Sequence, residues 1–171
     1  STLEYPYWYD EGFAEYLSTV EYKDGGANLG FPVTGRHSAA QNTVGGSLPS
    51  LERLLSSTRQ DRNVSTDMLY AYSWLLVQHI NHDPELAPKL VPYLTRYDES
   101  GDSLGACREV FDVDLDKLKR TLDRKLRKGK YKYRRMTFGN PLSAPAVEVS
   151  EMPVPDANVA LADVLRHFRS D

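Results

Sequence analysis

Cysteine is nearly absent from this sequence of 171 residues, in which Cys107 is the single example. One cysteine excludes an internal disulfide and any metal site built from several thiolates. Cys107 lies in the string SLGACREVF, at a spacing typical of the buried face of a short helix. We therefore expect a small core residue here, because the sequence indicates no base that would activate a catalytic thiol.

Long apolar runs are also missing. No stretch approaches the roughly 18 apolar residues that cross a bilayer, so we expect no membrane span. The first residues, STLEYPYW, contain neither a methionine nor a basic segment, so no targeting signal is visible. This leaves the compartment open, and it is compatible with a periplasmic or secreted location of the intact protein.

The sequence does contain apolar periodicity of the helical type. It predicts a mainly α-helical fold with a small β component, in the α+β class. A glycine-rich loop region at 23–49, with room for a hairpin, is expected after the first helix. The helix at 65–83 is apolar nearly all round, so we expect it in the middle of the domain. The expected helices span 7–22, 50–55, 65–83, 84–97, 102–111 and 114–128, and the expected strands lie within 27–33, 131–138 and 146–152.

The chain divides into three parts. Residues 1–138 are expected to form one domain, 139–155 a linker or short strand, and 156–171 an isolated amphipathic helix. We find no internal repeat.

Basic residues are concentrated late in the chain. From 120 to 135 nine Lys or Arg and one Asp give a net charge of +8, which leaves −11 for the remainder, since the total is −3. Such a stretch, with Tyr131 and Tyr133 interleaved, suits a phosphate backbone. However, about half of it is the solvated face and the C-terminal end of one helix, where the helix dipole favours bases. We therefore expect no nucleic-acid partner.

Two glutamates four residues apart lie within the aromatic string YPYWYDEGFAEYLS, residues 5–18. On a helix, Glu11 and Glu15 share a face with Trp8, while Tyr9, Phe13, Tyr16 and Val20 supply the opposite, packing stripe. Gly12 costs up to about 1 kcal/mol relative to alanine inside a helix, which is easier to understand if another element approaches the backbone there. Helical spacing alone is compatible with two interpretations. The glutamates either face a cation, a metal or hydrogen-bond donors, or they are rim residues paired with surface Arg or Lys.

The string W-Y-D-E-G-F-A-E-Y, residues 8–16, closely resembles the W-x-x-E-G-x-A-E-Y motif of gluzincin zinc metallopeptidases, especially bacterial peptidase-MA-like proteins. The resemblance implies that Glu11 is the third zinc ligand and that Glu15 orients a ligand histidine. It extends to LYAYSWLLVQHI, where Tyr70 matches the tyrosine that stabilises the oxyanion, with Tyr72 as a rival and a core tyrosine as the alternative. It covers roughly residues 5–128, so 1–138 would be the C-terminal part of a gluzincin-like domain. The final helix would then suit the start of a TPR-like repeat.

One part of the family pattern is missing from this sequence. The H-E-x-x-H motif, which supplies two zinc-binding histidines and the general base, is absent. We expect the chain to begin between the two motifs, so that the N-terminal half of the same protein supplies the missing groups, or else to be a relative that lost them. The intact protein would use zinc to hydrolyse a peptide or protein substrate. This chain alone is expected to bind no zinc and to be inactive.

The sequence is also compatible with two alternative hypotheses. The chain can be a non-catalytic helical interaction module that keeps a peptidase fold. His79 and His82, at i and i+3 near the end of the long helix, can bind a metal, although histidines near a helix C-terminus are commonly structural.

Overall fold

The computed structural model describes residues 4–43, 50–59, 65–138, 153 and 159. The chain separates into two compact units, 1–140 and 141–171. The first unit is mainly helical with a small antiparallel sheet, as the sequence predicts. Among the described residues no helix is both long and apolar enough to cross a membrane. The expected strand at 146–152, the linker and the final helix at 156–171 lie outside the described residues, apart from Pro153 and Val159.

In the sequence of the first unit, a β-hairpin lies between the first two helices, and a third strand follows the last described helix. They are α1 (Tyr7–Ser18), β1 (Glu21–Lys23), β2 (Gly26–Leu29), α2 (Thr34–Thr43), α3 (Leu51–Leu55), α4 (Thr66–His82), the short 3-10 helix η1 (Ala87–Lys89), α5 (Leu90–Ser100), α6 (Ser103–Val110), α7 (Leu115–Lys128) and β3 (Arg134–Thr137).

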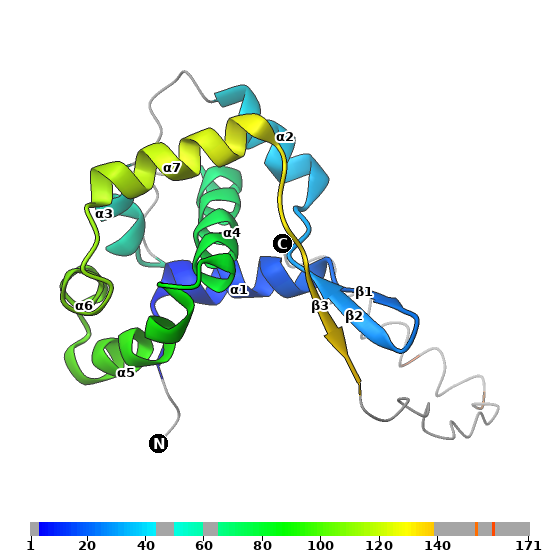
Figure 1. Ribbon diagram of the computed structural model, residues 1–171, viewed down its shortest axis with the longest axis horizontal. Coiled ribbons are helices and arrows are strands. Elements are labelled where there is room, and N and C mark those ends of the chain that lie inside the picture. Colours follow the sequence, from blue (N-terminus) through cyan, green and yellow to red (C-terminus); the bar gives the residue numbers. More distant parts are fainter. Residues whose placement is uncertain (1–3, 44–49, 60–64, 139–152, 154–158, 160–171) are drawn as a thin grey trace. The chain divides into compact units, whose positions relative to one another are not determined.

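Helix α4 is the centre of the helical part, and Figure 1 shows α1 and α7 on either side of it. Nearly every residue from Met68 to Ile80 is buried, because apolar side chains occur around its whole circumference. Helix α2 contacts both α4 and α7, and α5 pairs with α6. The expectation of a central helix at 65–83 is therefore confirmed.

The first helix is shorter than expected. It ends at Ser18 and not at Tyr22, because residues 21–23 form a strand. Asp24 and Gly25 both have positive φ, at 50° and 69°, which is the two-residue turn that joins twisted antiparallel strands. The hairpin pairs Tyr22 with Ala27, and Ala27 pairs in turn with Met136 of β3, giving the strand order β1-β2-β3.

The expectation of a loop region at 23–49 is correct in allowing for a hairpin, which occupies its start, and wrong further on, because α2 follows at 34–43. Helix α2 has one buried apolar side chain, Ala40. It is attached by His37, whose Nε2 lies 2.6 Å from the Tyr131 hydroxyl, and by Gln41, whose Nε2 donates to the carbonyl of Leu126 over 2.8 Å. Tertiary contacts, and not an apolar stripe, hold this helix.

Candidate functional site

Glu11 and Glu15 lie on α1, and Tyr70 lies on α4. These two helices make the most extensive contact in the described structure. Gly12 is the reason they come so close, since a Cβ placed there would lie 2.5 Å from the carbonyl oxygen of Ser73 on α4. The close approach expected at this glycine is therefore confirmed, and it brings the glutamates and Tyr70 to one region.

The buried face of α1 is rotated from the expected one. Trp8, Tyr9, Gly12 and Tyr16 are buried, whereas Phe13, assigned to the packing stripe, is 37% exposed. Glu11 and Glu15 lie at the border of this face and are both partly buried.

Glu15 is joined to Tyr70 through an arginine of α2. The Glu15 side chain is only 14% exposed, and its Oε1 pairs with the guanidinium of Arg36. The Arg36 guanidinium carbon lies 4.6 Å from the centre of the Tyr70 ring, within the range of a cation–π contact. Arg36 Nε also lies 3.8 Å from a carboxylate oxygen of Asp67. Arg36 therefore links α1, α2 and α4 at the candidate site.

Glu11 has no ion pair or hydrogen bond with any residue that the structure describes. Burial raises the pKa of Tyr7, which lies one helical turn before Glu11, and the Glu11 charge and the Tyr70 hydroxyl add to that increase. Tyr7, Glu11 and Tyr70 thus lie close together, with the Arg59 guanidinium 5.4 Å from the centre of the Tyr7 ring.

Tyr72, the alternative to Tyr70 as the oxyanion donor, forms a hydrogen bond outside the candidate site. It is fully buried, and its hydroxyl donates to Asp123 of α7, whose other oxygen accepts from Lys119 over 2.8 Å. Burial and the Asp123 hydrogen bond raise the pKa of Tyr72. Its hydroxyl therefore ties α4 to α7, whereas Tyr70 is only partly buried.

The residues present do not make a complete metal site. Within the described ranges no group of three His, Cys, Asp or Glu side chains could hold a metal ion. Glu11 provides one unpaired carboxylate, whereas Glu15 is already neutralised by Arg36. Zinc prefers four ligands in a tetrahedron, so this arrangement supplies at most one corner of such a site.

His79 and His82 have different partners for their Nδ1 atoms. His79 Nδ1 lies 2.8 Å from the ammonium of Lys125, and burial together with that charge lowers the pKa of His79 to about 4. His82 Nδ1 contacts the backbone carbonyl of Gln78 over 2.8 Å. A neighbouring ammonium opposes a dication, so the pair is better explained as structural.

Sequence reasoning missed three residues of this cluster: Tyr7, Arg36 and Asp67. Tyr7 precedes Glu11 by four residues, so helical spacing could have placed it on the same face. Spacing does not identify Arg36 in this way, because the sequence of its helix predicts a loop.

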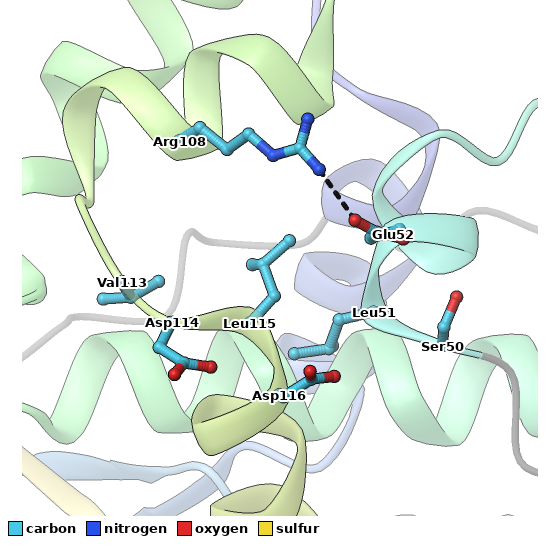
Figure 2. Close-up of a pocket in the computed structure, with 8 residues that line it drawn as sticks. All are labelled: Ser50, Leu51, Glu52, Arg108, Val113, Asp114, Leu115 and Asp116. Carbon is cyan, nitrogen blue, oxygen red and sulfur yellow. Dashed lines mark hydrogen bonds and ion pairs between the residues drawn. The ribbon is translucent and has the colours of Figure 1, made fainter.

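A pocket of about 330 Å³ lies elsewhere, between α3, α6 and the start of α7 (Figure 2). Its lining does not include Glu11, Glu15 or Tyr70. Arg108 Nη2 and Glu52 Oε1 are 2.7 Å apart and form an exposed ion pair across it. Exposed pairs of this kind add little to stability, and we assign the pocket no function.

The Arg36–Glu15 pair offers a direct test of the cluster. Arg36→Met leaves a largely buried carboxylate without its partner, so we expect the free energy of unfolding to fall by about 1–3 kcal/mol. The double variant with Glu15→Gln should recover part of that loss, and urea unfolding of all four proteins measures the coupling. Arg108→Met is the matched control in an exposed pair, with an expected effect below about 1 kcal/mol. Equal effects of the two arginine substitutions would contradict the special role of Arg36.

Comparison of the chain with family models, with curated proteins and with solved structures finds no match.

Proposed function

We propose that this chain contributes part of the active site of a zinc-dependent metallopeptidase of the gluzincin type. In this proposal Glu11 is one metal ligand, Glu15 positions a ligand histidine, and Tyr70 donates a hydrogen bond to the oxyanion. The main support for this proposal is the packing of Gly12 against Ser73, which brings these three residues to one region. Of the two carboxylates, Glu15 is paired with Arg36 and Glu11 has no such partner among the described residues. A metal ion would give the Glu11 carboxylate a charged partner.

The chain's own residues have distinct tasks in this proposal. Glu15 uses one carboxylate oxygen for Arg36 and keeps the other to accept a hydrogen bond from an imidazole. Arg36 fixes the Tyr70 ring from above, so that the phenol is held in one orientation. The two histidines and the general base are assigned to residues outside this sequence, and a peptide or protein is the substrate. Zinc would supply the activated water.

The test begins with the full reading frame that encodes this chain. If the proposal holds, that frame includes H-E-x-x-H, and the purified full-length protein holds one zinc per chain. Glu11→Gln removes the charged ligand, so zinc affinity measured by competition with a chelator should fall by about 100-fold or more. Glu21→Gln, an exposed glutamate of β1, is the control and should leave the affinity unchanged.

Two results would overturn the proposal. The first is a full-length protein that binds no zinc, and the second is zinc binding that Glu11→Gln does not weaken. Either would favour the non-catalytic interaction module, for which Glu11→Ala should leave every activity unchanged.

A further inference from the structure

The solvent-facing side of α7 carries mostly cations, although the exposed Asp116 also lies there, one helical turn before Arg120. Arg120, Arg124, Arg127 and Lys128 are spaced as i, i+4, i+7 and i+8, which places them on one helical face, and Lys130 follows Gly129. All five are exposed. We call these five residues the basic face.

No residue of the basic face forms an ion pair with a carboxylate in the described part of the chain. Arginines elsewhere do so: Arg59 pairs with Asp10, Arg96 with Glu109, and Arg108 with Glu52. On α7 itself, the acid within this stretch, Asp123, pairs with Lys119 on the flank. Within the described ranges the basic face therefore forms no ion pair with a carboxylate, in a chain whose total charge is −3.

Folding does not require this arrangement. Arg120, Arg124 and Lys128 form two consecutive i, i+4 pairs of like charge, and each such pair destabilises a helix. The helix dipole favours bases in the last turn, where Arg127 and Lys128 lie, but Arg120 and Arg124 precede that turn. The leucines that hold α7 in place, Leu122 and Leu126, lie on the opposite, buried side. The repulsion of Arg124 by Arg120 and Lys128 therefore opposes the stability of the helix.

We propose that the basic face binds the surface of an anionic phospholipid bilayer. A straight helix lying parallel to a plane of phosphates brings the cations on one of its faces within a Debye length of that plane. No apolar side chain belongs to the basic face, so the contact is electrostatic and peripheral. This inference does not depend on the proposed peptidase activity.

Single-stranded nucleic acid is the rival occupant, and the tyrosines next to the basic face argue against it. Tyr131 is turned inward, with its ring centre 4.8 Å from that of Trp74. Tyr133 is 55% exposed, but its ring stacks on that of Phe31 at 5.3 Å between ring centres. Proteins that bind single strands stack bases on free aromatic rings, and here both rings are already in contact with protein side chains.

Vesicle co-sedimentation of the 171-residue chain tests the proposal. We expect binding to phosphatidylcholine vesicles that contain about 30% phosphatidylglycerol and none to pure phosphatidylcholine, with strong weakening as salt rises to about 0.5 M. Each cation near the surface contributes about fivefold in partitioning, so Arg120→Gln with Arg124→Gln should weaken binding roughly 25-fold. Arg96→Gln with Arg108→Gln removes the same charge from paired positions and should leave binding unchanged.

Arg124→Glu separates binding from folding. It creates opposite-charge i, i+4 pairs with Arg120 and Lys128, so the melting temperature should stay the same or rise while vesicle binding is lost. Equal binding to neutral vesicles, equal loss in the control double variant, or no vesicle binding at low salt would each overturn the proposal. Tighter, salt-sensitive binding to an oligonucleotide that displaces the vesicles would do so as well, and would assign the basic face to nucleic acid.

Discussion

Gly12→Ala is expected to destabilise the protein by about 2–3 kcal/mol, although alanine is the better helix former by up to about 1 kcal/mol. The added Cβ would lie 2.5 Å from the carbonyl oxygen of Ser73 and 2.6 Å from its carbonyl carbon. Both atoms belong to the backbone of α4, so no flexible side chain can move aside. The helices must separate instead, and the buried contact between them is lost. Urea unfolding measures the change as a lower midpoint.

Gly35→Ala is the matched control for this prediction. Gly35 also lies in a helix, but a Cβ there meets nothing within 4 Å. The same chemical change should therefore leave stability unchanged or raise it by up to about 1 kcal/mol. If Gly12→Ala behaved like Gly35→Ala, the close contact between α1 and α4 would be refuted.

Trp8→Ala should cost about 3–5 kcal/mol, a large part of the stability of a typical domain. Trp8 is fully buried, and its indole Nε1 donates to the Tyr93 hydroxyl over 3.0 Å and to Ser103 Oγ over 3.1 Å. It therefore attaches α1 to α5 and α6 as well as filling the core. Removing the indole creates a cavity and also releases the helix that carries both glutamates. Thermal and urea unfolding, compared with the parent protein, measure the loss.

Two further substitutions divide the Trp8 effect into its parts. Trp8→Phe keeps most of the volume but loses the donor, while Tyr93 and Ser103 keep their 2.8 Å hydrogen bond to each other, so about 1–3 kcal/mol should be lost. Phe13→Ala, on the exposed side of α1, should cost less than either. A Trp8→Ala protein as stable as Phe13→Ala would contradict the anchoring role of Trp8.

The sequence predicts best those helices whose caps and apolar stripe are formed by residues close together in the chain. Helix α7 begins after Asp114, whose side chain accepts from the backbone N–H of Lys117, and ends at Gly129 with φ of 59°. Between these caps, Leu122 and Leu126 are buried as their spacing predicts. A cap at each end and an apolar stripe leave no competing conformation.

The errors occur where distant residues decide the local structure. Strand β2 lies between β1 and β3, and its partners in β3 are more than a hundred residues away, as the 107-residue separation of Asn28 and Arg135 illustrates. Because that pairing competes with extending α1, the helix stops early. Helix α2 shows the same effect, since its contacts through His37 and Gln41 reach residues of the chain's late segment.

For the candidate site, the motif and helical spacing were enough to select Glu11, Glu15 and Tyr70, but not to show how they are connected. The connection passes through Arg36, on a helix without an apolar stripe, so no periodic signal marks it. The roles of the three residues rest on the resemblance and on their proximity. Phe13 shows the limit of spacing alone, because it is 37% exposed while Gly12 lies on the buried face of α1.

The sparse attachment of α2 has a consequence for amide hydrogen exchange. A helix with one buried apolar side chain, Ala40, opens locally at a lower free energy than one buried from Met68 to Ile80. Such an opening withdraws Arg36 and uncovers Glu15 and the Tyr70 ring, while α1 and α4 stay in contact. The pairing of Glu15 with Arg36 thus depends on the local opening equilibrium of α2. A ligand that competes with Arg36 for the Glu15 carboxylate needs to displace only α2, without unfolding the core.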